Sequence, residues 1–150
     1  ELGNHSWAHE NLAKLSGPAV QESIQKTNRA IREATGQSAT LVRPPYGSLG
    51  GKARPTLAAM GYSATLWDID TLDWKTKNAD NTVNVVLSQV KDGDIVLMHS
   101  IYAQSAAAAE RIIPELTRRG YQLVTVSELA AARGVKMEPG HSYGSFHKKK

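Results

Sequence analysis

The sequence predicts an α/β fold in which helices wrap a parallel sheet. Three observations support this prediction. Short strand signals alternate with helical patterns at least three times along the chain. The apolar run at 95–98 is continuous, which is typical of a parallel strand buried on both faces. Polar clusters also recur just after the predicted strands, which is where parallel α/β folds place their active sites.

The first half of the chain contains two predicted helices and one strand. The first helix begins after the N-cap candidate Ser16 and ends at Gly36. A short buried strand at 40–42 follows, and it ends at a Pro-Pro turn that cannot continue as a helix. Residues 52–60 form the second helix, which ends at Gly61.

The second half repeats the alternation of strand and helix. The predicted elements are a strand at 63–67, a loop at 68–74, a helix at 83–90, a strand at 94–99, a helix at 105–119, a strand at 121–126 and a helix at 127–133. No repeat or linker divides the chain, so we expect one domain at 1–134. A polar, basic and poorly ordered C-terminal tail is expected at 135–150.

The composition excludes several classes of protein. The chain of 150 residues contains no cysteine, which excludes disulfides and thiolate metal sites. No apolar run approaches the length of a membrane span. The formal net charge is +4, and most of it comes from the lysines at 148–150, which we interpret as a solvated tail. No basic stripe is interleaved with aromatic residues, so nucleic acid is not an expected partner.

The stretch Asn4-His5-Ser6-Trp7-Ala8-His9-Glu10 is a candidate metal site. Its two histidines are four residues apart, so a coiled segment would project both imidazoles from one face. That spacing suits one zinc-like ion, and a catalytic zinc site keeps three protein ligands and an open position for water. Ser6 stands where the metalloprotease motif has its glutamate base, so another residue must supply the base. The alternative interpretation is two unrelated surface histidines.

Three further clusters accompany this stretch, and we expect all four on one side of the sheet. They are Arg43-Pro44-Pro45-Tyr46-Gly47, Asp70-Thr71-Leu72-Asp73-Trp74 and Ile95-Val96-Leu97-Met98-His99. Together with His5-Ser6-Trp7-Ala8-His9, and in the same order, they resemble the motifs of the polysaccharide deacetylase family, also called the NodB-homology family or carbohydrate esterase family 4. The resemblance covers 1–133 and is strongest to Gram-positive peptidoglycan N-acetylglucosamine deacetylases.

The resemblance implies a distorted (β/α) barrel whose C-terminal part is present here and whose first strands are missing. In that family an aspartate and two histidines hold a divalent metal, and His5 and His9 match the histidines. Zinc is the expected ion, with cobalt or a similar ion as the alternative. The aspartate and the general base belong to a Thr-Phe-Asp-Asp-Gly motif that this sequence lacks. The chain also starts without methionine on its histidine motif, so we expect a missing N-terminal segment, present as a separate chain.

The resemblance also assigns residues to the steps of amide hydrolysis. The backbone N–H of Tyr46 matches a donor to the oxyanion and a contact to the substrate. His99 matches the general acid that protonates the leaving amine. Asp73 matches the aspartate that holds His99 and favours its charged form. Arg43 matches the arginine that orients the missing catalytic aspartate.

Two apolar residues, Trp74 and Leu97, match the pocket that receives the acetyl methyl group. Plainer interpretations remain open for these positions: both would also serve as core, and His99 would also suit a hydrogen-bonded core histidine. Asp68 and Asp70 are interpreted as loop structure or as substrate hydrogen-bonding groups.

The expected function is metal-dependent deacetylation of N-acetylglucosamine in a cell-wall polysaccharide, above all peptidoglycan, in an extracellular or cell-surface location. An O-acetyl(xylan) esterase or a chitooligosaccharide deacetylase of the same family is the alternative, because substrate loops decide the leaving group. An inactive carbohydrate-binding homologue is the alternative from another class. The presence of both metal histidines together with Arg43, Asp73 and His99 argues against that last alternative.

Overall fold

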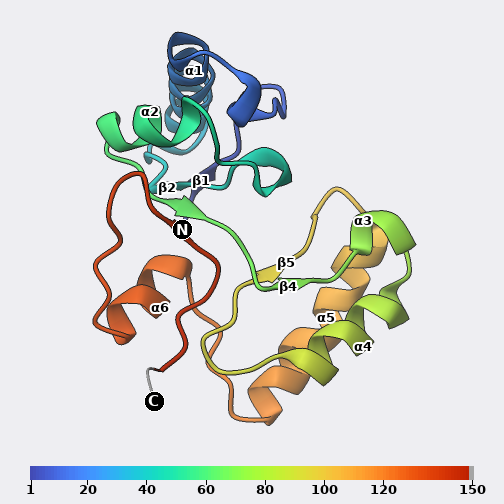
Figure 1. Cartoon of the computed structure of the whole chain (residues 1–150). Coiled ribbons are helices and arrows are strands. Elements are labelled where there is room, and N and C mark those ends of the chain that lie inside the picture. Colours follow the sequence, from blue (N-terminus) through green and yellow to red (C-terminus); the bar gives the residue numbers. More distant parts are fainter. Residues whose placement is uncertain (149–150) are drawn as a thin grey trace. The chain divides into compact units, whose positions relative to one another are not determined.

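The computed structural model describes residues 1–148 and divides the chain into two compact units (Figure 1). Unit 1 consists of residues 1–66 and 134–143, and unit 2 of residues 67–133 together with the residues from 144 onward. We had expected one undivided domain ending at 134, whereas residues 134–143 group with the first part of the chain. In the described part, no helix is both long enough and apolar enough to cross a membrane.

Unit 1 contains a four-stranded parallel sheet with the strand order β1-β2-β3-β6. Its strands are β1 (Gly3–Asn4), β2 (Leu41–Val42), β3 (Ala64–Thr65) and β6 (Ser142–Tyr143). Asn4 lies opposite Val42 in the register of the first two strands. The predicted parallel α/β architecture is therefore confirmed, although each strand is only two residues long.

The helices of unit 1 agree with the expected boundaries. They are α1 (Gly17–Thr35) and α2 (Ala53–Ala59), with short 3-10 turns at η1 (Leu12–Lys14) and η2 (Pro45–Gly47). The side chain of Ser16 accepts a hydrogen bond from the Ala19 N–H and begins α1, and Gly36 ends it in a left-handed conformation. Val20 and Ile24 of α1 pack in a buried cluster with Leu12, Val42, Ala53 and Leu57.

Unit 2 pairs the parallel strands β4 (Ile69–Asp70) and β5 (Val96–Leu97) and adds four helices. The helices are α3 (Asp73–Thr76), α4 (Ala79–Gln89), α5 (Ala103–Arg118) and α6 (Val126–Ala132). Helices α4 and α5 lie side by side in Figure 1 and share one apolar core, made by Val83, Val86, Ala108, Ile112 and Leu116. Asp73 is the first residue of α3, and Ser105 lies in the first turn of α5.

Two predictions for unit 2 are wrong. Residues 121–125 form a loop and not a strand; Leu123 and Val124 are 50% and 42% exposed, so the run lacks the burial that a core strand needs. The loop leads into α6 through a capping box between Thr125 and Glu128. The predicted loop at 68–74 instead contains β4 and the start of α3.

The expectation of a poorly ordered tail is also wrong for residues 142–147. Ser142 pairs with Ala64 in the sheet of unit 1. In unit 2 the Phe146 N–H donates to the Gly93 carbonyl oxygen at 2.7 Å, and the Phe146 side chain is buried. Of the three terminal lysines, those at 149 and 150 lie outside the described residues.

Candidate active site

His5 and His9 lie on the loop that follows β1. The expected coiled segment, which would project both imidazoles from one face, does not form. Ser6 and His9 have φ angles of 65° and 56°, which belong to the left-handed region and break any helix. The loop nevertheless brings the two rings together edge to face, with their centroids 5.0 Å apart. The expected pairing of the two imidazoles is therefore present, although turn geometry produces it.

A fully buried asparagine anchors this loop to α1. The Asn4 Nδ2 donates to the Ile24 carbonyl oxygen at 2.9 Å and to the Asn28 Oδ1 at 2.8 Å. The Asn4 Oδ1 accepts from the Ser6 N–H at 2.9 Å. The side chain thus holds the backbone one residue before and one residue after His5.

Glu10 fixes the other end of the loop. Its Oε2 accepts from the Ala8 N–H at 3.0 Å and from the Ser23 Oγ at 3.2 Å. The Ser23 Oγ in turn accepts from the Trp7 N–H at 2.9 Å. Burial raises the pKa of Glu10, but the hydrogen bonds from Ala8, Ser6 and Ser23 outweigh it and hold that pKa below its ordinary value.

We predict that Asn4→Ala lowers the free energy of unfolding by about 2–4 kcal/mol, because it leaves several buried polar groups without a partner. Urea denaturation of the parent and the variant measures this loss. Asn84→Ala on the exposed face of α4 is the matched control and should change stability by less than about 0.5 kcal/mol. Equal effects of the two substitutions would contradict an anchoring role for Asn4.

The two imidazoles suit a divalent metal. The His5 Nδ1 lies 2.5 Å from the carbonyl oxygen of Arg43. Because a carbonyl oxygen can only accept, Nδ1 carries the hydrogen and Nε2 has the lone pair, as is usual for metal-binding histidines. The His9 ring lies edge-on to Tyr46, with centroids 4.7 Å apart. Within residues 1–148, no carboxylate joins the two histidines in a group of three ligands.

Arg43 and Tyr46 lie at the Pro-Pro turn that follows β2. Tyr46 has a φ of 61°, and 68% of its surface is exposed. Burial lowers the pKa of the Arg43 guanidinium. Among the described residues no group accepts a hydrogen bond from the buried Arg43 Nε. A buried donor without a partner is costly, and an acidic group would satisfy this one.

In unit 2, Asp73 holds His99 as expected. The His99 Nδ1 lies 2.7 Å from Asp73 Oδ1, so it donates to the carboxylate. Asp73 Oδ2 accepts from the His99 N–H at 2.7 Å and from the Ser105 Oγ at 2.6 Å. The Asp73 side chain is 1% exposed and that of His99 is 31% exposed. The ring is therefore fixed through its Nδ1 and its backbone, and Nε2 is the nitrogen that can serve a substrate.

Sequence reasoning missed Ser105, which it had treated only as the first residue of a helix. Burial raises the pKa of Asp73, but the hydrogen bonds from Ser105 and His99 outweigh it and hold that pKa below its ordinary value. Asp73 is therefore a carboxylate at neutral pH. Local sequence carries no signal for this contact, because Ser105 and Asp73 are 32 residues apart and meet only in the folded chain.

Asp73→Asn should destabilise the fold by about 1.5–3 kcal/mol at neutral pH, because its amide cannot accept as the carboxylate does. A lowered folded-state pKa means that this contribution is present above the unfolded pKa. It is lost as the pH falls through the folded-state pKa, which the hydrogen bonds from Ser105 and His99 hold below the ordinary value of an aspartate. Denaturation of both proteins across the acid range should therefore show the gap shrinking as the pH falls. Asp80→Asn, at a carboxylate that is 82% exposed, is the control and should show little gap at any pH.

The remaining predicted residues divide between exposed and core positions. Trp74 is 46% exposed, whereas Leu97 is buried in β5 and its carbonyl oxygen accepts from the Thr71 Oγ1 at 2.8 Å. Asp70 is the last residue of β4 and not part of a loop, and its Oδ1 accepts from the Leu72 N–H at 2.9 Å. The structure thus groups the predicted residues within each unit: His5, His9, Arg43 and Tyr46 in unit 1, and Asp73, Trp74, Leu97 and His99 in unit 2. That all four clusters share one side of a sheet stays a prediction.

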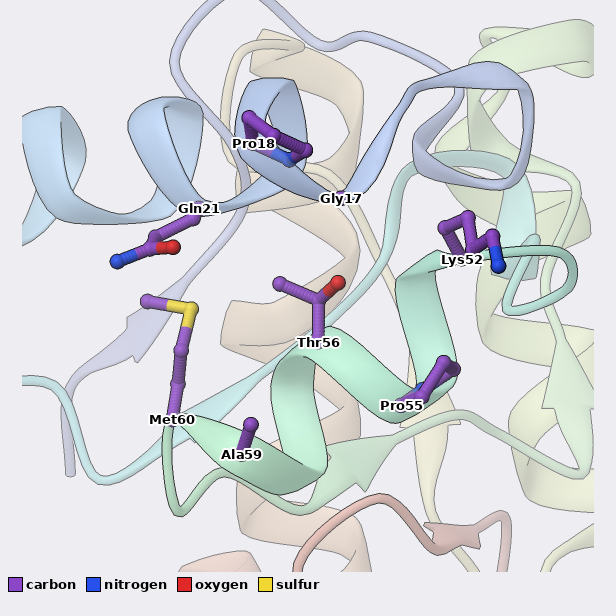
Figure 2. A pocket seen from close by; sticks show the side chains of 8 residues that line it. All are labelled: Gly17, Pro18, Gln21, Lys52, Pro55, Thr56, Ala59 and Met60. Carbon is purple, nitrogen blue, oxygen red and sulfur yellow. The ribbon is translucent and has the colours of Figure 1, made fainter.

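Figure 2 shows a hollow beside α1 and α2 in unit 1. It is lined by Gly17, Pro18, Gln21, Lys52, Pro55, Thr56, Ala59 and Met60. None of these is a predicted site residue, and they include no imidazole or carboxylate. Its lining therefore has no usual metal ligand, and its ionisable group is the Lys52 amine.

Comparison with known proteins identifies the family. The family model for polysaccharide deacetylase matches residues 1–65. The solved structure of the T48 deacetylase with substrate is 36% identical in sequence and has a TM-score of 0.88, covering 95% of this chain and 69% of that one. The chain belongs to the polysaccharide deacetylase family. A family 4 acetyl xylan esterase from Clostridium thermocellum, solved in complex with a cobalt ion, is 29% identical with a TM-score of 0.86, covering 97% of this chain and 72% of that one.

Curated members of the polysaccharide deacetylase family are also similar over most of the chain. The peptidoglycan-N-acetylmuramic acid deacetylase PdaC of Bacillus subtilis is 45% identical over 86% of this chain. The peptidoglycan-N-acetylglucosamine deacetylase PgdA of Listeria monocytogenes is 37% identical over 95% of it. The chain spans 27% and 29% of the length of these two relatives. The predicted family and fold are thereby confirmed.

Proposed function

We propose that this chain carries metal-binding and acid residues of a deacetylase that releases acetate from N-acetylglucosamine in peptidoglycan outside the cell. The observation that carries the proposal is the buried Asp73 carboxylate, which orients His99 with a ring nitrogen left for the substrate. The peptidoglycan deacetylases among the relatives support this substrate class.

His99 acts as the general acid. Its Nδ1–H is held by Asp73, so a charged ring donates its Nε2 proton to the nitrogen of the departing glucosamine. Asp73 itself remains ionised, because Ser105 and the His99 backbone N–H both donate to it. The pair therefore supplies a proton at one defined atom and recovers it from water after the amine leaves.

His5 and His9 would hold a divalent ion, with zinc as the proposed identity. When bound, the ion polarises the amide carbonyl and lowers the pKa of a bound water. The tautomer that Arg43 imposes on His5 and the close pairing of the two rings fit this role. The Arg43 carbonyl oxygen thus orients the His5 ring through Nδ1, the nitrogen that would not bind the metal.

We further propose that carboxylates outside the described residues supply the third metal ligand and the general base. The buried Arg43 Nε supports this, since it lacks an acceptor among the described residues and a carboxylate would provide one. The missing segment would then be a partner of this chain in every active form of the enzyme.

Two alternatives differ in the substrate and in the bond cleaved. PdaC, at 45% identity, is a deacetylase of peptidoglycan N-acetylmuramic acid. This similarity favours N-acetylmuramic acid, in place of N-acetylglucosamine, as the substrate. The similarity to an acetyl xylan esterase favours an O-acetyl ester. Neither alternative changes the proposed roles of His5, His9 and His99.

Product analysis tests the proposal. The natural-length protein with zinc is incubated with peptidoglycan, and the digested fragments are analysed by mass spectrometry. We expect loss of acetyl groups from glucosamine; loss from muramic acid alone, or acetate release from acetylated xylan alone, would favour the two alternatives. No acetate from any of these polymers would overturn the enzymatic proposal and favour an inactive carbohydrate-binding homologue.

A further inference from the structure

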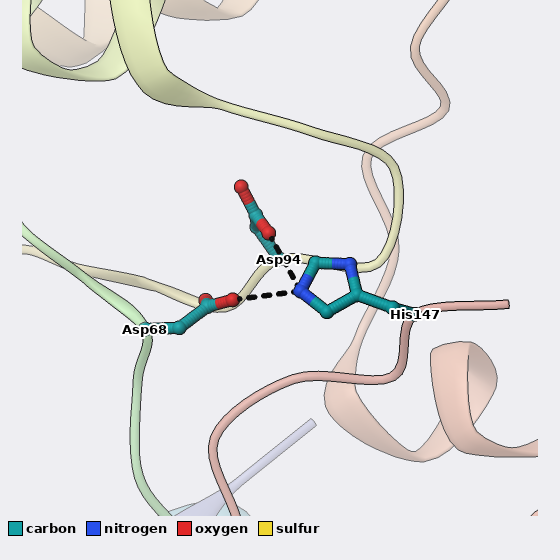
Figure 3. Close-up of side chains that lie close together, drawn as sticks. All are labelled: Asp68, Asp94 and His147. Carbon is teal, nitrogen blue, oxygen red and sulfur yellow. Dashed lines mark hydrogen bonds and ion pairs between the residues drawn. The ribbon is translucent and has the colours of Figure 1, made fainter. Parts of the chain in front are cut away.

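A second group of metal-ligating side chains lies at the other ends of β4 and β5 from Asp73 and His99. Asp68 immediately precedes β4 and Asp94 lies two residues before β5, whereas Asp73 and His99 follow these parallel strands. His147 reaches both carboxylates from the C-terminal segment (Figure 3). Its Nε2 lies 3.1 Å from Asp68 Oδ2 and 3.2 Å from Asp94 Oδ1.

Backbone groups outside the cluster orient each of the three side chains. The His147 Nδ1 lies 3.1 Å from the carbonyl oxygen of Asp92. The second oxygen of each carboxylate accepts a backbone N–H: Asp68 Oδ1 from Ile95 at 2.9 Å and Asp94 Oδ2 from Lys91 at 2.6 Å. Metal-binding histidines and carboxylates are held by outer contacts of this kind.

These contacts decide which atoms face one another. The Asp92 carbonyl oxygen can only accept, so the hydrogen of a neutral His147 ring is on Nδ1. Nε2 then presents a lone pair to two carboxylate oxygens, which also have only lone pairs. Three acceptor atoms at these distances repel one another unless positive charge lies among them.

We propose that Asp68, Asp94 and His147 bind one divalent transition-metal ion of the zinc type. A tetrahedral ion with ligands at about 2.0–2.1 Å separates its ligand atoms by about 3.3 Å. The Nε2 lies 3.1 Å and 3.2 Å from the two carboxylate oxygens, and all three ligand atoms lie within 4.8 Å of one another. An imidazole in the set favours zinc-like ions over magnesium or calcium.

The position of this second metal site indicates a structural role. It lies at the amino-terminal ends of the strands, where parallel α/β folds place residues that serve stability and not chemistry. The ion would tie 68, 94 and 147 together and reinforce the hydrogen bond from Phe146 to Gly93. The His147 side chain is 46% exposed, so an ion can reach the ligands from solvent.

Zinc titration of the natural-length protein tests the second metal site apart from the first. The His5→Ala/His9→Ala double variant, freed of metal by chelator, is titrated with zinc chloride in a calorimeter. We expect a zinc-binding event that His147→Ala or Asp68→Asn weakens by at least about tenfold. The thermal midpoint should rise with zinc in the double variant and rise less once His147 is replaced.

His141→Ala is the matched control, because His141 is an exposed histidine of the same C-terminal segment. It should leave zinc binding by the double variant unchanged. Zinc binding that is absent from the double variant, or equally strong with and without His147, would overturn the proposal. In either case a protonated His147 ring, without an ion, would offset part of the charge of the two carboxylates. Because the double variant lacks the proposed catalytic metal ligands, this result is independent of the deacetylase activity.

Discussion

His99→Ala should slow hydrolysis of an N-acetyl amide by about 10²–10⁴-fold, the usual contribution of a general acid or base. The reason is that an amine leaves only when its nitrogen is protonated, and Asp73 holds His99 for that step. The rate constant for acetate release from an N-acetylglucosamine oligomer, measured in the natural-length protein with zinc, gives this loss.

An activated acetate ester provides the comparison that makes the His99 prediction specific. Its leaving group needs little protonation, so His99→Ala should slow ester cleavage far less than amide cleavage. Metal content should stay at the parent value, because His99 is not a proposed ligand. Equal losses on amide and ester, or loss of metal in the variant, would show that His99 has a different role.

Replacing both His5 and His9 by alanine should remove one equivalent of zinc and reduce amide hydrolysis to background. The two rings lie 5.0 Å apart between centroids, and they supply both nitrogen ligands of the proposed catalytic metal site. Zinc content by elemental analysis and acetate release, measured on the same preparation, check both parts of this expectation.

The exposed His141 again supplies the control, and His141→Ala should retain parental zinc content and activity. Circular dichroism of the double variant should match the parent, since Asn4 and Glu10 hold the loop without help from either imidazole. A double variant that keeps all of its zinc would contradict the assignment of the metal ligands.

The sequence was sufficient to predict elements whose signals are local. Ser16 and Gly36 mark α1 by side-chain capping and by a left-handed stop, and both act within one helical turn. The apolar run at 95–98 predicted β5, although the expected burial on both faces is incomplete: Ile95 and Leu97 are buried, whereas Val96 and Met98 are only partly buried. The pairing of Asp73 with His99 followed from the family motif, and the hydrogen bond between them agrees with it.

Other features depend on contacts between residues far apart in the chain. The apolar residues at 121–126 resemble a strand, yet no partner strand covers Leu123 and Val124. The polar segment after 134 contributes β6, because its pairing with β3 comes from backbone hydrogen bonds and not from side-chain pattern. The grouping of Asp68 and Asp94 with His147 spans most of unit 2 and has no local signal.

The dependence of acetate release on metal tests the central claim most directly. The natural-length protein is assayed on peptidoglycan before chelation, after chelation, and after zinc is added back, with the His5→Ala/His9→Ala variant in parallel. We predict that chelation stops acetate release, that zinc restores it in the parent, and that zinc fails to restore it in the variant. Acetate release that continues undiminished in chelator, or that zinc restores equally in the variant, would contradict the assignment of a metal-dependent deacetylase built on these two histidines.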